Sequence, residues 1–143
     1  MKIDIYTDGS CCPTNPGPGG WAAILRTKVN GQVHEKEISG RKDQATNNEM
    51  EMLAVEEGIK AVKKPGCSIT VYTDSQLVVG YMRFGWRPKV PHLAEIIGRI
   101  SARVSLMGHT VEYVKLNGHS GHELNERADR LAKKALQAGG LSQ

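Results

Sequence analysis

The order of strand-like and helix-like segments constrains the fold of this chain most strongly. A Pro/Gly-rich turn over 12–20 and the pair Asn30-Gly31, which favours a tight hairpin, separate three segments with the composition of strands. These segments cover residues 2–8, 20–28 and 32–40. The first part of the chain is therefore expected to form an antiparallel meander of three strands.

Helices and strands alternate after the meander. A helix is predicted from Thr46, which opens a Thr-x-x-Glu capping box, to the Pro65-Gly66 stop. The later elements are expected to be a strand over 68–73, a helix from 75 to about 83, a helix introduced by Pro91, a strand over 110–115 and an amphipathic helix over 124–135. This order predicts an α/β fold in which the meander and two parallel strands form one mixed five-stranded sheet flanked by α-helices.

Length and composition favour a single domain over residues 1–143. Hydrophobic residues make up 39% of the chain and charged residues 24%, which excludes a disordered or collagen-like class. The longest apolar runs are strand-sized and the amino terminus has no apolar block, so we expect a cytoplasmic protein without a membrane partner. The net charge of +4 suits a polyanionic partner. Nothing in the sequence requires an obligate protein partner, and a monomer is expected.

Two of the expected strands end in the same Tyr-Thr-Asp triplet. Asp8 and Asp74 therefore lie at the carboxyl ends of apolar strands, which is where open α/β sheets bind their ligands. If the two strands are parallel neighbours, both carboxylates can reach one ion. The alternative is that Asp8 begins a turn and Asp74 caps a helix. Either residue alone would favour that alternative, but the repetition favours a shared site.

Glu51 lies at the centre of the apolar stripe of the helix after Thr46. At about 100° per residue, Val55, Gly58 and Val62 all fall within roughly 40° of it. A carboxylate facing the core has a large desolvation cost, so a cation is expected beside it. A buried Lys or Arg would serve, but a metal ion held jointly with the two strand-end aspartates explains all three residues together.

The opposite side of this helix carries most of its other charged residues. These are Glu49, Glu56, Glu57 and Lys60. Glu49 is therefore assigned to helix capping and solvent. Leu53 also falls on this polar side, and the pattern gives no reason for it.

The last quarter of the chain adds further candidates. Asp129 lies at the edge of the apolar stripe of the final helix, and alone it would be read as a solvated residue. His119 and His122 lie in the glycine-rich loop before that helix, where a mobile histidine suits proton transfer or metal ligation, although surface histidines without a function are commoner. No cysteine pair accompanies them, which argues against a zinc site.

Five short motifs occur in an order that resembles the type 1 ribonuclease H family over nearly the whole chain. They are Tyr6-Thr7-Asp8-Gly9-Ser10, Asn15-Pro16-Gly17-Pro18-Gly19-Gly20, Thr46-Asn47-Asn48-Glu49-Met50-Glu51, Thr73-Asp74-Ser75-Gln76, and Gly118-His119-Ser120-Gly121-His122 with Asn125-Glu126-Arg127-Ala128-Asp129. The resemblance implies the ribonuclease H-like fold. It places the four acidic residues of the family at Asp8, Glu51, Asp74 and Asp129.

The resemblance implies an endonuclease that hydrolyses the RNA strand of an RNA/DNA hybrid and leaves 3′-hydroxyl and 5′-phosphate ends. Two Mg²⁺ ions, for which Mn²⁺ can substitute, would be bound by the four carboxylates, with Asp8 as the bridging ligand. His119 corresponds to the mobile histidine of the family, which acts in proton transfer or product release.

The resemblance also implies contacts with the hybrid from Asn15, Thr46, Asn47, Asn48 and Gln76. Amide side chains can reach the minor groove and the 2′-hydroxyls that distinguish RNA from DNA. Thr46 is expected to cap its helix and also to hold a phosphate of the DNA strand at the helix amino terminus.

The interval between Asp74 and Pro91 departs from many bacterial members, because it is too short for their extra helix and strongly basic loop. Phe84 or Trp86 can stack near the DNA backbone beside the basic residues of this interval. An aromatic anchor that packs the connection onto the core is an equally good interpretation.

Two other function classes remain as alternatives. The first is a catalytically silent nucleic-acid-binding module, which would gain nothing from four clustered, repelling carboxylates. The second is a related metal-dependent nuclease or strand-transfer enzyme, against which the Asn47-Asn48 pair and the Gly-His loop favour ribonuclease H.

Overall fold

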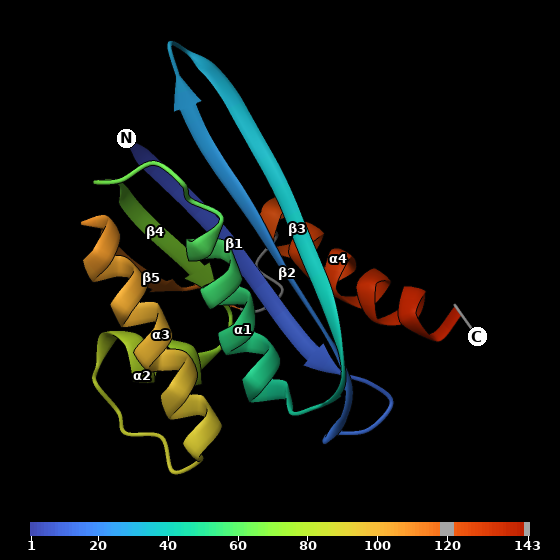
Figure 1. Cartoon of the computed structure of the whole chain (residues 1–143). Coiled ribbons are helices and arrows are strands. Elements are labelled where there is room, and N and C mark those ends of the chain that lie inside the picture. The colour runs from blue at the N-terminus through green and yellow to red at the C-terminus, as the bar shows by residue number, and fades with distance from the viewer. Residues whose placement is uncertain (118–121, 142–143) are drawn as a thin grey trace.

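The computed structural model describes residues 1–117 and 122–141 of the chain. Its strands are β1 (Lys2–Cys11), β2 (Gly17–Val29), β3 (Gln32–Ala45), β4 (Ser68–Thr73) and β5 (Thr110–Lys115). They form one sheet in the order β3-β2-β1-β4-β5 (Figure 1). The β1–β2 and β2–β3 pairs are antiparallel, and the β1–β4 and β4–β5 pairs are parallel. The predicted mixed five-stranded sheet is confirmed.

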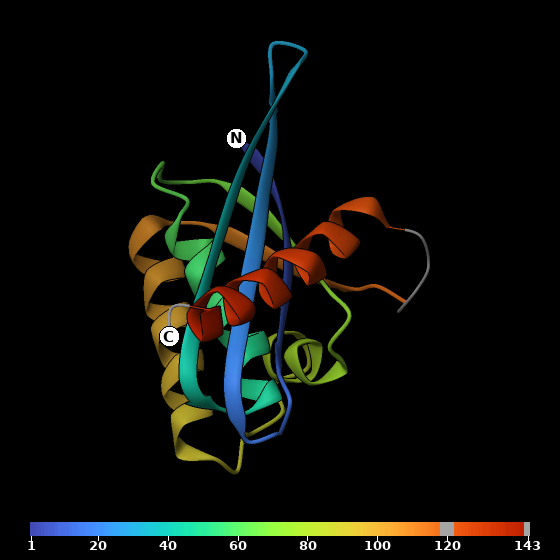
Figure 2. The same cartoon turned by 90° about the vertical axis from the view of Figure 1, so that its right-hand side faces the viewer.

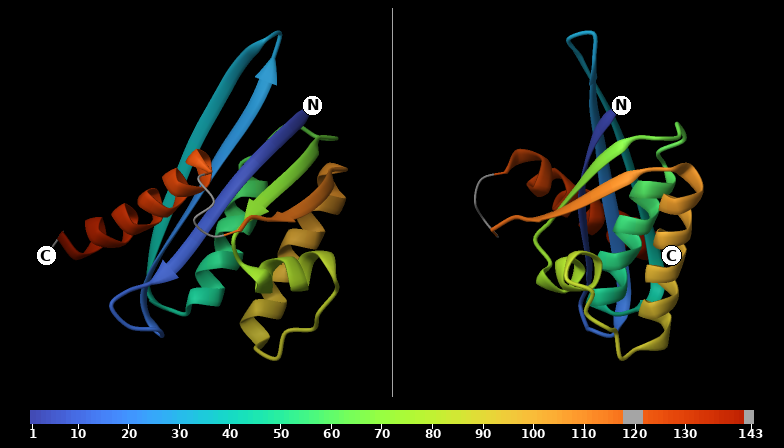
Figure 3. Two further views of the ribbon diagram at one scale, coloured as in Figure 1. Left: turned by 180° about the vertical axis from the view of Figure 1, so that it is seen from behind. Right: turned by 90° about the vertical axis from the view of Figure 1, so that its left-hand side faces the viewer.

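The helices are α1 (Asn47–Lys60), α2 (Gln76–Arg83), α3 (Pro91–Met107) and α4 (Glu123–Leu141). Three of them, α1, α2 and α3, cover one face of the sheet, and α4 runs across β1, β2 and β3 on the other face (Figures 2 and 3). In the described part of the chain, no helix is long and apolar enough to cross a membrane.

Both strands of the β2–β3 hairpin are longer than the sequence predicted. Gly17 pairs with Ala45 and Gly19 with Lys42, so the glycine-rich segment that was assigned to a turn is the first part of β2. Cys11 pairs with Gly19 in the same way and extends β1. The sequence signal was misleading because glycine and proline favour turns, whereas here the glycine backbone bonds to strands on both sides.

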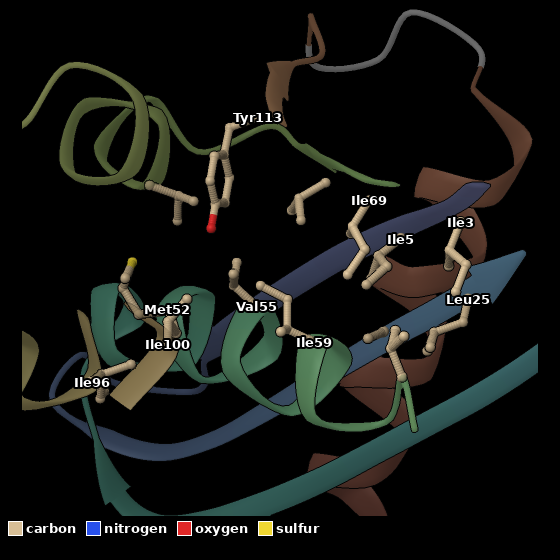
Figure 4. Close-up of a cluster of buried hydrophobic side chains, with 14 of the residues drawn as sticks. Ile3, Ile5, Leu25, Met52, Val55, Ile59, Ile69, Ile96, Ile100 and Tyr113 are labelled. Carbon is tan, nitrogen blue, oxygen red and sulfur yellow. The ribbon is translucent and has the colours of Figure 1, made fainter. Parts of the chain in front are cut away.

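The main core lies between the sheet and the helices α1, α2 and α3. Isoleucine and valine side chains of β1 and β4 meet the buried face of α1, and Ile96 and Ile100 of α3 close the layer (Figure 4). Tyr113 of β5 reaches into the same core, where burial raises the pKa of its hydroxyl. A core of this kind fixes α1, and with it Glu51, relative to the ends of the strands.

α1 packs against two neighbours, which corrects part of the helical-wheel prediction. Glu49 and Glu56 are buried rather than solvated. Glu49 pairs with Lys42 of β3, and Glu56 accepts two hydrogen bonds from Arg99 of α3, at 2.7 and 3.0 Å. Leu53 is partly buried against the main core. A wheel with one apolar stripe assumes one packing partner, whereas α1 also contacts α3 and the end of β3.

The ends of the helices follow local sequence signals. The Thr46 hydroxyl accepts the Glu49 N–H at 3.2 Å, which confirms the predicted cap, and Ser75 caps α2 through the Val78 N–H. Pro91 begins α3 as expected, and Gly108, with a φ of 68°, ends it. α1 ends at Lys60, before the predicted stop at Pro65, and Ala61 is its C-cap. The Val62 N–H bonds to the carbonyl of Ile59, three residues back rather than four, so the α-helical pattern does not continue.

Candidate functional site

Three carboxylates meet at the carboxyl ends of β1 and β4. β1 and β4 are parallel neighbours with Tyr6 opposite Tyr72, so the aspartates two residues further on in each segment end side by side. One oxygen from each of Asp8, Glu51 and Asp74 lies within 4.8 Å of the other two. The expected proximity of the strand-end aspartates is confirmed, and Glu51 joins them from α1.

Gly9 allows α1 to approach the end of β1. A Cβ atom at this position would lie only 2.4 Å from the carbonyl carbon of Met50, so any larger residue would displace the helix. The Gly9 N–H donates a hydrogen bond of 3.1 Å to Glu51 Oε1. The family motif at residues 6–10 therefore has a structural reason for its glycine as well as for its aspartate.

Glu51 is buried, with 9% of its surface exposed. Its second oxygen, Oε2, is buried and receives no hydrogen bond from the described residues. Neither oxygen is bonded to a Lys or Arg in the described parts of the chain, so the buried basic partner that the sequence left open is not found there. An orphaned carboxylate oxygen beside two further carboxylates fits a bound cation.

Burial and like charge make this group a poor place for negative charge without a cation. Burial raises the pKa of Asp8 to about 7, and the hydrogen bond that Asp8 donates to Asp129 adds to the effect. Burial also raises the pKa of Glu51 well above its usual range, and the charge of Asp8 contributes. An all-oxygen donor set with this excess of negative charge suits a hard divalent ion such as Mg²⁺ or Mn²⁺.

Asp129 approaches from the other face of the sheet. It lies outside the group of three, but its side chain accepts the hydrogen bond from Asp8. Its second partner is Lys133, one turn further along α4, whose Nζ lies 3.0 Å from Asp129 Oδ2. Although burial acts to raise the pKa of Asp129, the bonds from Asp8 and Lys133 outweigh it and hold that pKa below its usual value. Lys133 was missed in the sequence, although its i, i+4 spacing from Asp129 was a usable signal.

The predicted substrate residues of the first half of the chain form one cluster beside the carboxylates. The Asn47 N–H donates to Asn15 Oδ1 at 2.9 Å, and the Cys11 N–H donates to Asn47 Oδ1 at 2.7 Å. Both amide oxygens are therefore used to shape the loop, which leaves the amide NH₂ groups as donors. Asn48 is exposed next to them at the start of α1.

Gln76 and the two aromatic candidates lie on and after α2. Gln76 is exposed in the first turn of that helix, two residues from Asp74. The Trp86 ring lies against α2, because a Cβ atom on Gly80 would be 2.0 Å from Trp86 Cε3, and the Trp86 N–H donates to the Gly80 carbonyl at 3.0 Å. This packing supports the anchor interpretation for Trp86. Phe84 is 62% exposed, with the Arg83 guanidinium 5.4 Å from the centre of its ring.

His119 lies outside the described residues, so its predicted role stays a prediction. His122 is described and exposed just before α4, where its carbonyl accepts the Glu126 N–H.

Comparison with known proteins decides the family. The family profile described as RNase H matches residues 1–137. The ribonuclease H of Bradyrhizobium diazoefficiens is 41% identical over an alignment that covers 99% of this chain and 94% of that protein. The chain belongs to the ribonuclease H family. The curated relatives of this ribonuclease H indicate a nuclease.

Solved structures agree with this assignment. The RNase H1 of Halobacterium salinarum superposes with a TM-score of 0.80 at 26% identity, covering 96% of this chain and 99% of that chain. LC11-RNase H1, solved in complex with an RNA/DNA hybrid, gives a TM-score of 0.78 at 26% identity, covering 96% and 98%. The fold of this ribonuclease H is therefore that of type 1 enzymes.

Proposed function

We propose that this ribonuclease H is a single-domain endonuclease that hydrolyses the RNA strand of RNA/DNA hybrids and leaves 3′-hydroxyl and 5′-phosphate ends. The observation that carries the proposal is the group formed by Asp8, Glu51 and Asp74, in which a buried Glu51 oxygen has no donor among the described residues. The hybrid bound by the similar LC11-RNase H1 supports the choice of substrate.

Two divalent ions would be held by Asp8, Glu51, Asp74 and Asp129. Asp8 is the proposed bridging ligand, because its carboxyl group lies beside Glu51 and Asp74 and also meets Asp129. When bound, Mg²⁺ supplies an activated attacking water and stabilises the negative charge on the leaving 3′-oxygen. The four carboxylates bind the ions only when ionised, so ion binding is expected to lower the pKa values of Asp8 and Glu51, which burial raises.

Donor groups beside the carboxylates would select the hybrid. The NH₂ groups of Asn15 and Asn47, whose oxygens are bonded to backbone N–H groups, can only donate. The minor groove of a hybrid presents acceptors, namely base edges and the 2′-hydroxyl oxygens of the RNA strand. Asn48 and Gln76 are also exposed and can act in the same way.

The remaining residues would position the DNA strand or transfer a proton. Thr46, at the amino terminus of α1, is the proposed contact for a DNA-strand phosphate, where the helix dipole favours an anion. Phe84 is the proposed aromatic contact, because most of its ring is exposed whereas Trp86 packs on α2. His119 is proposed to transfer a proton during cleavage or product release. All these residues belong to one chain, so a monomer suffices.

A substrate panel tests the proposal. The protein is incubated with an end-labelled RNA/DNA hybrid, duplex RNA, duplex DNA and each single strand, in Mg²⁺ and in EDTA. We expect cleavage of the hybrid's RNA strand alone, only with metal, and new 5′ ends that a kinase cannot phosphorylate until a phosphatase has treated them. Binding of the hybrid without cleavage in Mg²⁺ or Mn²⁺ would indicate a silent binding module, and cleavage of duplex DNA would indicate another nuclease class.

A further inference from the structure

Among the described residues, the apolar cluster between α4 and the sheet is smaller than the main core. This cluster consists of Ile24, Leu124 and Ala128, with Tyr6 and Leu131 at the edge. α1, by contrast, packs into the main core (Figure 4). Because apolar burial is the main force that fixes a helix to a sheet, polar contacts decide the position of α4 to a larger extent than that of α1.

The strongest polar contacts of α4 are made by Arg127. Its Nη1 donates to Glu35 Oε1 at 3.1 Å, and its Nη2 and Nε donate to Glu37 Oε2 at 2.6 and 3.2 Å. Both glutamates lie on β3, in the long hairpin that extends beyond the rest of the sheet (Figure 1). The planar guanidinium is thus fixed by two carboxylates, which restricts its orientation as well as its position.

The helical positions of Arg127 and Asp129 connect this ion-pair group to the carboxylate site. Ala128 is buried against the sheet, and its two neighbours project about 100° to either side of it. Arg127 therefore holds one flank of α4 on β3, while Asp129 on the other flank meets Asp8. A rotation of α4 about its own axis, which Arg127 opposes, would move Asp129 away from Asp8.

A close backbone contact fixes the next turn of α4. A Cβ atom on Gly20 of β2 would lie 2.2 Å from the Ala132 carbonyl oxygen, so this turn lies directly on the strand. The contact at Gly20 and the restraint by Arg127 on one flank together limit the rotation of α4, and with it the position of Asp129.

We propose that Arg127, together with Glu35 and Glu37, is a positioning residue that holds Asp129 at the carboxylate site and thereby sets the affinity of this site for divalent metal. The inference rests on the proposed function, because it assumes that Asp129 is a metal ligand. Arg127 itself touches neither substrate nor metal in this proposal.

The first test compares Arg127→Gln with Arg99→Gln. Arg99 makes a similar two-bond contact with Glu56 between α1 and α3, so it is a matched control away from α4. For Arg127→Gln we expect the Mg²⁺ concentration for half-maximal hybrid cleavage to rise roughly tenfold, with the rate at saturating Mg²⁺ largely retained. Arg99→Gln should lower the unfolding temperature but leave the Mg²⁺ midpoint unchanged. Equal midpoints for Arg127→Gln and the wild type would overturn the proposal.

A second readout does not depend on cleavage. The rise in unfolding temperature on adding Mg²⁺ to the free protein reports metal affinity. It should be smaller for Arg127→Gln and for the double variant Glu35→Gln/Glu37→Gln than for the wild type. Combining all three changes should have no further effect, because they remove the same contact. Independent, additive effects of the two sets of changes would contradict a shared role.

A third comparison shows whether Arg127 acts through Asp129. In an Asp129→Asn background, Arg127→Gln should no longer change the Mg²⁺-dependent rise in unfolding temperature; a persisting change would overturn the proposal.

Gly20→Ala, which should push α4 outward without changing any charge, is expected to reproduce the raised Mg²⁺ midpoint, and a normal midpoint would count against the proposal. Failure of the proposed function would appear separately, as absence of cleavage by the wild type.

Discussion

Among single residues, Asp8 has the central place in the carboxylate site. Its carboxyl group lies beside Glu51 and also meets Asp129, and the charge of Asp74 acts on it as well. Burial is the main cause of the raised pKa of Asp8, and the negative charges of Asp74 and Asp129 add to it when no cation is present. The residue that the proposed chemistry needs most is therefore one that destabilises the metal-free fold.

The first prediction concerns Asp8→Asn. We expect this change to abolish hybrid cleavage, because the bridging ligand is lost, and to leave the free energy of unfolding in EDTA near pH 8 unchanged or higher. The amide has nearly the shape of the carboxylate and can still donate to Asp129, but it removes a repelling charge. Urea unfolding of both proteins in EDTA measures the effect. Marked destabilisation of the metal-free variant would show that Asp8 has a structural role.

The second prediction concerns pH. The pKa of Asp8 is 3.8 in a free chain and about 7 in the folded protein, so between these values the folded state holds a proton that the unfolded state has released. The contribution of Asp8 to stability therefore falls as the pH rises through this window and is constant above it. The free energy of unfolding of the wild type in EDTA, minus that of Asp8→Asn, should fall by on the order of 2 kcal/mol from about pH 5 to about pH 8. A difference that does not change with pH would contradict the raised pKa.

At the scale of elements, local signals predicted which segments form helices and strands better than they predicted what those segments contact. The helix cap at Thr46 and the paired Tyr-Thr-Asp triplets are local features, and both predictions are confirmed. The assignment of Glu49 to solvent was wrong, because Lys42 of β3 reaches the first turn of α1. A helical wheel contains no information about a second or third packing partner.

Long-range pairs were beyond sequence reasoning for the same reason. Arg127 lies within a recognised motif, but its glutamate partners on β3 are about 90 residues away in the chain. Their pairing depends on α4 lying across the hairpin on the face opposite to α1. The sequence predicted helices on the faces of the sheet without assigning each helix to one face.

The third prediction separates the two aromatic residues after α2. Trp86→Ala should lower the free energy of unfolding by about 1–2 kcal/mol, because the indole covers Gly80 of α2. Phe84→Ala should change stability by about 0.5 kcal/mol or less but raise the KM for the hybrid severalfold. Thermal unfolding and steady-state cleavage measure the two effects. The reverse pattern, with Trp86 affecting only KM, would assign the substrate contact to Trp86.

At the scale of the whole molecule, the candidate site is assembled from both faces of the sheet. α1 brings Glu51 from one face and α4 brings Asp129 from the other, while β1 and β4 end between them with Asp8 and Asp74 (Figures 1 and 2). The sheet is thus the common reference for four side chains that are far apart in the sequence. This arrangement explains why a small change in the docking of one helix is expected to affect metal binding before it affects folding.

The fourth prediction concerns the positively charged residues in the short connection between α2 and α3. Arg87 and Lys89 are exposed there, so their positive charges can contact phosphates of a bound hybrid. In an Asp74→Asn background, which prevents cleavage, Arg87→Gln/Lys89→Gln should reduce the slope of log affinity against log salt by about 2. Lys63→Gln/Lys64→Gln changes the same charge after the end of α1 and should leave the slope unchanged. Equal slopes for both double variants would show that the connection does not contact the hybrid.

The most direct test of the proposed site is the cleavage of a labelled RNA/DNA hybrid by the wild type, Asp74→Asn and Asp4→Asn, each in Mg²⁺ and in EDTA. Asp4 lies on β1 and faces the same side of the sheet as Asp8, so it controls for the loss of a carboxylate elsewhere on this strand. We predict that the wild type and Asp4→Asn cut the RNA strand in Mg²⁺ only, and that Asp74→Asn binds the hybrid without cutting it. Cleavage by Asp74→Asn at the wild-type rate, or cleavage by any of the three proteins in EDTA, would contradict a metal-dependent site built on these carboxylates.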